Sequence, residues 1–228
     1  MTSGRNIKRF TLDLLGADTW EDRLPELLGP PSRRVINPLF SALLHPDPLI
    51  KWHAVTGFGV LVPAMAEQSM EQARVVMRRF LWMLNEESGG IGWGIAEAMA
   101  EVLANHESLA GEYHTNLLAY IHEDECRPDC FLEHCLLRRG AVWGVARLAL
   151  VRPEMAAPAA DDLLCQLSDA DPYNRGYACW GLGLLGHNEA GPRLDALGDD
   201  FSRIELYRNR VLETVSVSAL AREALTRL

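Results

Sequence analysis

Apolar residues recur at three- and four-residue steps along most of the chain, a spacing that places them on one face of an α-helix. Leu117, Leu118 and Ile121 are one example. Few runs of β-branched residues interrupt this pattern, and Leu and Ala are abundant, which also favours helices. We therefore predict amphipathic helices at residues 36–44, 70–85, 109–122 and 155–167.

A second, more apolar helical segment follows each amphipathic one, and each of these segments carries a tryptophan. The four tryptophans are Trp52, Trp93, Trp143 and Trp180. They follow one another at steps of 41, 50 and 37 residues. Solenoids of stacked helix pairs repeat with a period of about 40–47 residues. The spacing predicts such a stack, with an insertion at residues 123–133 that accounts for the longest step.

Glycines inside the apolar segments indicate close contacts between helices. Gly57, Gly59, Gly181 and Gly183 all fall within predicted helices. A glycine there costs roughly 1 kcal/mol relative to alanine, so the close approach of a neighbouring helix is the expected compensation. Asp171 and Pro172 mark the start of the fourth apolar helix, with the aspartate as its cap.

The pattern changes near the C-terminus. Residues 202–217 alternate between apolar and polar positions, which predicts two strands with a turn at Arg208-Asn209. One long helix is the alternative for this segment. Ser218 is then expected to cap a last helix at residues 219–228.

The repeats resemble those of HEAT-repeat proteins, including the HEAT-like repeats of phycobilisome lyases and small single-domain HEAT proteins of bacteria. The resemblance rests on residues 155–190 above all, through Arg175, Ala178, Gly181, Gly183 and Gly186. It implies an all-α fold, a right-handed α-solenoid of about five HEAT-like helix pairs. We expect a single domain over residues 1–228, with a cap at 1–30, repeats at 31–200 and the hairpin and capping helix at 201–228.

Composition narrows the classes of function. The chain has 228 residues, 48% of them hydrophobic and 23% charged, and its mean hydropathy is −0.04. Its apolar runs, such as residues 57–66, are too short to span a bilayer, and no apolar stretch follows the basic N-terminus. A cytoplasmic location is therefore expected. The net charge of −9 makes nucleic acid an unfavourable partner.

Histidines and cysteines gather in and beside the predicted insertion. The thiolate and imidazole groups are those that bind zinc or an iron–sulfur cluster. However, Pro128 would break a helix that aligned them, and an inserted loop with unligated thiols is the alternative. The candidate ligands are His122, Cys126, Cys130, His134 and Cys135.

Charged residues interrupt two of the apolar helices at equivalent positions. Glu97 follows Trp93, and Arg147 follows Trp143, each four residues later. Since buried charges need partners, we predict an ion pair or a shared polar network between adjacent repeats, with Glu101 one turn further on. The alternatives are a pair that sets the register of the stack and a polar spot in a concave binding groove.

Pairs of arginines occur in three repeats, at residues 33–34, 78–79 and 138–139. If the three arginine pairs lined one surface, Arg138 and Arg139 would extend the concave binding groove. HEAT-type alkylpurine DNA glycosylases use a groove of this kind with a catalytic carboxylate beside aromatic residues, and Glu97 near the tryptophans is a loose analogue. Solvated helix faces that pair with nearby acids are the alternative.

No catalytic triad appears at a recognisable spacing, so catalysis is not the first expectation. The sequence favours a non-catalytic scaffold that binds a protein partner through its concave surface, without a cofactor. A bilin-lyase-like or metal-binding module using the Cys/His loop is one alternative, and a nucleic-acid-binding protein of the glycosylase type is another. The candidate binding residues are Trp93, Glu97, Glu101, Arg138, Arg139, Trp143 and Arg147.

Overall fold

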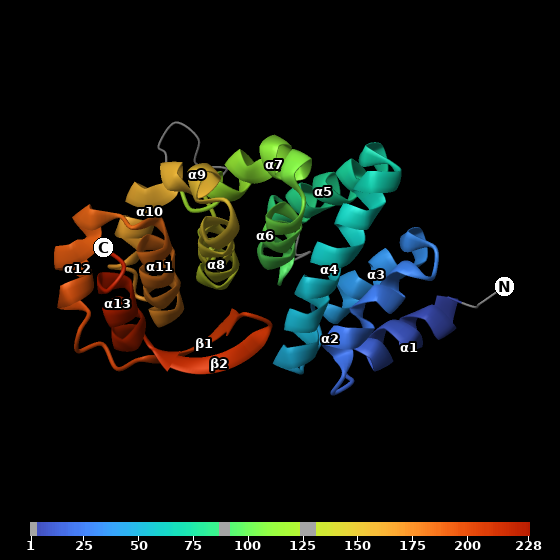
Figure 1. Cartoon of the computed structure of the whole chain (residues 1–228), viewed down its shortest axis with the longest axis horizontal. Coiled ribbons are helices and arrows are strands. Elements are labelled where there is room, and N and C mark those ends of the chain that lie inside the picture. Colours follow the sequence, from blue (N-terminus) through green and yellow to red (C-terminus); the bar gives the residue numbers. More distant parts are fainter. Residues whose placement is uncertain (1–3, 87–91, 124–130) are drawn as a thin grey trace. The chain divides into compact units, whose positions relative to one another are not determined.

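The computed structural model describes residues 4–86, 92–123 and 131–228, and it shows helices throughout with one hairpin of strands (Figure 1). The chain forms two compact units, Met1–Ala110 and Gly111–Leu228. In each unit the helices pack in pairs, as the hydrophobic periodicity predicts, and the HEAT-like helical repeat fold is confirmed.

The first unit begins with a short helical cap and continues with two helix pairs, α3 with α4 and α5 with α6. The 3-10 turn η1 completes the cap. The elements are α1 (Gly4–Leu15), α2 (Trp20–Arg23), η1 (Leu24–Leu28), α3 (Ser32–Ala42), α4 (Pro48–Gln68), α5 (Met70–Leu84) and α6 (Ile95–Asn105), and α7 (Glu107–Ala119) crosses into the second unit.

The second unit holds the remaining pairs and the hairpin. Its elements are α8 (Cys135–Val151), α9 (Pro153–Ala156), η3 (Ala157–Ala159), α10 (Ala160–Gln166), α11 (Pro172–Leu185), η4 (Asn188–Ala190), α12 (Gly191–Ala196), β1 (Arg203–Arg208), β2 (Val211–Ser216) and α13 (Val217–Leu225). The helix predicted at 155–167 is interrupted by η3, since Pro158 has no N–H to continue the helical ladder.

The apolar second helices of the repeats pack directly on one another, although Trp93 lies just before its helix rather than in it. α4 lies against α6 in the first unit, and α11 lies against both α8 and α13 in the second. Glycines permit this closeness, as predicted. A Cβ added at Gly183 would lie 2.7 Å from the Ala224 Cα, and one at Gly181 would lie 3.0 Å from the Leu163 Cδ1.

Helix α4 forms the core of the first unit. Its 21 residues are long and apolar enough to cross a membrane by length and composition, which the shorter apolar runs in the sequence did not indicate. However, 67% of that apolar window is buried inside the unit. Contacts with α3, α5 and α6 therefore account for its apolar surface.

The hairpin prediction is confirmed. β1 and β2 pair antiparallel, and the turn between Arg208 and Val211 places Asn209 and Arg210 at φ values of 54° and 62°. A two-residue turn in which both residues have positive φ matches the right-handed twist of the two strands of a hairpin. The predicted cap Ser218 is wrong, because the last helix begins directly after β2 and the Ser216 hydroxyl accepts the Ala219 N–H instead.

Candidate functional site

Arginine–aspartate pairs join successive repeats of the second unit at the start of α8 and α11. Arg138 Nη2 lies 2.9 Å from Asp169 Oδ2, and Arg175 Nη2 lies 2.7 Å from Asp200 Oδ2. Arg139 pairs with Asp171. The two predicted groove residues Arg138 and Arg139 are therefore engaged within the fold in this structure, and their role in binding a partner stays a prediction.

Asp171 also caps α11, as predicted. Its Oδ1 accepts the Tyr173 N–H at 3.0 Å, while its own N–H donates to Asp169 Oδ1 at 2.7 Å. A cap of this kind is typically worth about 1 kcal/mol. One short loop thus ends α10, starts α11 and anchors two arginines of α8.

Burial alone would raise the pKa of both Asp169 and Asp200, but hydrogen bonds outweigh it. The backbone N–H of Asp171 and the guanidinium of Arg138 lower the pKa of Asp169 below its usual value. Ser202 and Arg175 do the same for the pKa of Asp200. Both carboxylates therefore stabilise the folded state while they are ionised.

We expect acid to weaken the second unit through these two groups. Their folded pKa lies below the unfolded value of about 3.9, so the unfolded chain binds more protons as the pH falls below that value. Their stabilisation is present at higher pH and is lost as the pH falls through the folded pKa. Urea unfolding midpoints measured across the acid range should fall less steeply for Asp200→Asn than for the wild type.

The exposed Asp195 of α12 offers a matched control for that measurement. Asp195→Asn should keep the wild-type dependence of the urea midpoint on pH. An Asp200→Asn curve parallel to the wild-type curve would contradict the assignment.

Trp143 lies in the core of the second unit and holds the hairpin. Its side chain is 1% exposed, and its Nε1–H donates to the Tyr207 carbonyl at 2.9 Å. The Tyr177 hydroxyl donates to the Glu205 carbonyl at 2.7 Å. Two aromatic side chains of α8 and α11 therefore bind the backbone of an extended strand of the same chain.

The predicted charged positions of the first unit also have partners. Glu97 is 7% exposed, and its Oε1 lies 3.0 Å from the Lys51 Nζ. The buried Glu101 accepts a hydrogen bond from Asn105 at 3.0 Å, and Trp93 is half-buried. Arg147 belongs to the second unit, so its predicted pairing with Glu97 stays a prediction.

The predicted Cys/His site is described only in part. Cys126 and Cys130 lie outside the described residues. His122 Nδ1 lies 2.8 Å from Asp162 Oδ1, whereas His134 immediately precedes α8 and Cys135 is exposed at its first position. Whether these residues bind a metal stays a prediction.

A surface groove that the sequence did not indicate lies between α3, the end of α4 and α5. Its volume is about 420 Å³. Val75 and Trp82, on the outward face of α5, are 55% and 63% exposed. Their spacing of seven residues is visible in the sequence, but on that face of the helix both lie among polar residues, so the pattern does not predict an apolar surface there. The groove is lined by Arg33, Ile36, Met65, Gln72, Val75 and Val76.

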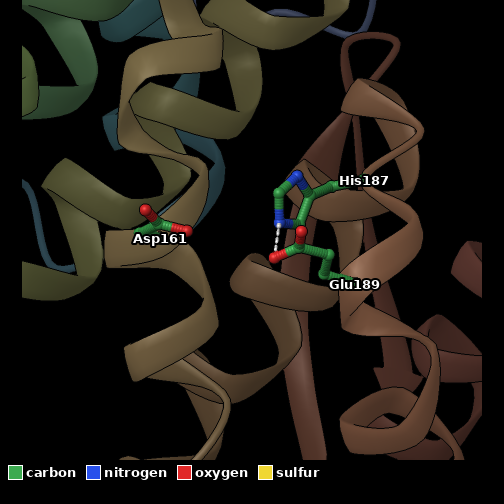
Figure 2. A group of neighbouring side chains, drawn as sticks. All are labelled: Asp161, His187 and Glu189. Carbon is green, nitrogen blue, oxygen red and sulfur yellow. Dashed lines mark ion pairs between the residues drawn. The ribbon is translucent and has the colours of Figure 1, made fainter.

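A cluster of three groups in the second unit could hold a metal ion. Figure 2 shows Asp161 of α10 facing His187 and Glu189, which follow α11. Their ligand atoms all lie within 4.8 Å of one another. The sequence did not single out any of these residues, which are up to 28 positions apart.

Comparison with known proteins supports the fold alone. No protein-family model and no curated protein matches the chain. Among solved structures, a designed armadillo repeat protein in complex with the peptide (KR)4 is similar over 98% of this chain and 91% of that one, with a TM-score of 0.55 and 15% identity. A second designed armadillo repeat protein has a TM-score of 0.53 and 15% identity over 98% and 92% of the two chains.

Proposed function

We propose that this HEAT-like repeat protein is a non-catalytic scaffold that binds a segment of a protein partner. The groove of the first unit carries the proposal, because it is an apolar depression beside exposed apolar side chains. Large exposed apolar groups beside a groove are typical of surfaces that bind a partner. The concave surface predicted from the sequence is a second location for the same function.

The groove is built on a rigid frame. Arg79 of α5 donates to the Asn37 side chain at 2.7 Å, and its guanidinium lies 3.7 Å from the centre of the Phe40 ring. These contacts tie α5 to α3 beside the groove. Since both walls are helices held by packed side chains, the groove exists before a ligand arrives, which lowers the entropic cost of binding.

The side chains define the chemistry of the partner. Ile36, Met65 and Val76 offer apolar walls, so an aliphatic or aromatic side chain would fill the groove. Arg33 at the groove suits a neighbouring carboxylate. Trp82 stands two helical turns from Val75, about 11 Å along α5, a distance that an extended peptide covers in about four residues.

The structure of the designed armadillo protein with a TM-score of 0.55 is a complex with a basic peptide, (KR)4. That ligand shows that a fold of this kind can present a peptide-binding surface. The arginine at the groove of this chain favours the opposite charge. We therefore propose an apolar and acidic peptide segment as the ligand class.

Selection from a display library of short random peptides tests the proposal. We expect wild-type protein to enrich peptides with an apolar anchor and a nearby carboxylate. Val75→Glu and Trp82→Ala should each weaken the binding of these peptides about tenfold or more, because exposed tryptophans at an interface often contribute over 1.4 kcal/mol. Fluorescence anisotropy with synthetic peptides gives the affinities.

The chain offers a matched control for each variant. Val211 and Phe201 of the second unit are 60% and 69% exposed, close to the exposure of the groove residues. Val211→Glu and Phe201→Ala should leave the affinities unchanged. The proposal fails if no peptide is enriched, or if the control variants weaken binding as much as the groove variants do.

A further inference from the structure

The turn at the end of α11 fixes the position of His187. Gly186 adopts a left-handed conformation with φ of 61°, and the His187 N–H then donates to the Leu182 carbonyl at 3.2 Å. This arrangement is a Schellman motif, which closes a helix and turns the chain sharply. The Ala190 N–H donates to the His187 carbonyl at 3.0 Å, so the next turn brings Glu189 back beside the imidazole.

The imidazole of His187 has an unused nitrogen. Its Nε2 is buried and makes no hydrogen bond within the described part of the chain. Glu189 Oε2 lies 4.0 Å from this nitrogen, too far for a hydrogen bond. The His187 side chain as a whole is 24% exposed. A buried polar atom left unsatisfied costs about 1–3 kcal/mol, and such exceptions in a folded protein call for an explanation.

Asp161 approaches the same imidazole from another helix. It lies on the exposed side of α10, and its carboxylate, the His187 imidazole and the Glu189 carboxylate converge (Figure 2). Their ligand atoms are within 4.8 Å of one another, so small rotations of the two exposed carboxylates would bring all three to a common centre. We propose that Asp161, His187 and Glu189 bind one divalent transition-metal ion.

The ligand types indicate which metal fits. One imidazole and two carboxylates form a mixed nitrogen and oxygen set without a thiolate, which zinc accepts at about 2.0–2.2 Å. Calcium and magnesium prefer oxygen ligands alone. Three protein ligands leave a further position for water, and the ion would link α10 to the segment between α11 and α12. Zinc is therefore the metal that we assign to this cluster.

This inference is independent of the peptide-binding proposal, which concerns the first unit. It is also distinct from the Cys/His hypothesis, which shares none of the three residues. A test must separate the two metal hypotheses, because thiolates bind zinc strongly. We would therefore work with the full chain in which Cys126, Cys130 and Cys135 are replaced by serine.

Zinc chloride titrated into this protein and followed by calorimetry should show one bound ion. His187→Gln and Asp161→Asn, each in the same background, should weaken zinc binding tenfold or more. Removing a residue that only hydrogen-bonds to a metal ligand already costs at least that much affinity. At one zinc concentration, the melting temperature of the parent protein should rise more than that of either variant, since an ion that binds only the folded state stabilises it in proportion to its affinity.

The exposed Glu205 of β1 gives a matched control, and Glu205→Gln should bind zinc as the parent does. Asp161 is exposed, so Asp161→Asn tests the cluster even if His187→Gln does not fold. Cobalt, which replaces zinc and absorbs visible light when bound, should show its bands in the parent and lose them in Asp161→Asn. The proposal is overturned if the parent binds no zinc, or if its affinity is the same in both cluster variants.

Discussion

Replacing Trp143 with alanine should lower the free energy of unfolding of the second unit by about 4 kcal/mol. Trp143 is the largest of the fully buried side chains, so truncation leaves a cavity between α8 and α11. It also leaves the Tyr207 carbonyl without its indole donor. Urea unfolding followed by circular dichroism measures the loss.

A conservative variant separates the contribution of the buried ring from that of the indole hydrogen bond. Trp143→Phe keeps an aromatic ring in the core but removes the N–H, so it should cost less than alanine does, although the smaller ring also leaves some empty space. Faster amide exchange in β1 is its expected signature, since the hairpin loses one of its anchors. Trp82→Ala, at a 63% exposed tryptophan, should change stability by less than about 0.5 kcal/mol. A Trp143→Ala protein as stable as Trp82→Ala would refute the assigned role.

Two glycine-to-alanine changes should act in opposite directions. Gly183→Ala places a methyl group 2.7 Å from the Ala224 Cα, so α11 and α13 must separate, at an overpacking cost of about 3 kcal/mol. Subtracting the roughly 1 kcal/mol gained in helix propensity leaves a net loss of about 2 kcal/mol. Thermal and urea unfolding would both report it.

Gly111 is the control for this change. It also lies inside a helix, but a Cβ added there meets nothing within 4 Å. Gly111→Ala should therefore raise the free energy of unfolding by up to about 1 kcal/mol, because only the propensity changes. If both variants were stabilising, helix packing could not be the reason that glycine occupies position 183.

The repeat architecture could be predicted because the signals that define it lie close together in the sequence. The spacing of apolar residues, the cap at Asp171 and the alternation around Asn209 each act within a few residues of the chain. The errors also have local causes. Alternation alone does not locate the end of β2, so it predicts the cap at Ser218 instead of Ser216. The first turn of α3 is polar and largely exposed, so apolar periodicity predicts its start at residue 36, although the helix begins at Ser32.

The candidate sites were less predictable, because they depend on distances across the fold. Glu97 could find a cation in any neighbouring helix, and the structure places Lys51, 46 residues earlier, beside it. The groove on α3 and α5 requires knowing that Val75 and Trp82 remain uncovered. The Asp161 cluster depends on a turn at Gly186 whose direction no periodicity reveals.

The bond between Trp143 and Tyr207 has a consequence for synthesis on the ribosome. The two residues are 64 positions apart. At a synthesis rate of about 5–20 residues per second, Tyr207 is therefore added roughly 3 to 13 s after Trp143. Until β1 is made, the Trp143 indole and the Tyr177 hydroxyl lack the carbonyl acceptors that they have in the folded unit. The first unit closes over shorter separations, such as the 46 positions between Lys51 and Glu97. We therefore expect the nascent second unit to depend more on chaperones than the first unit does.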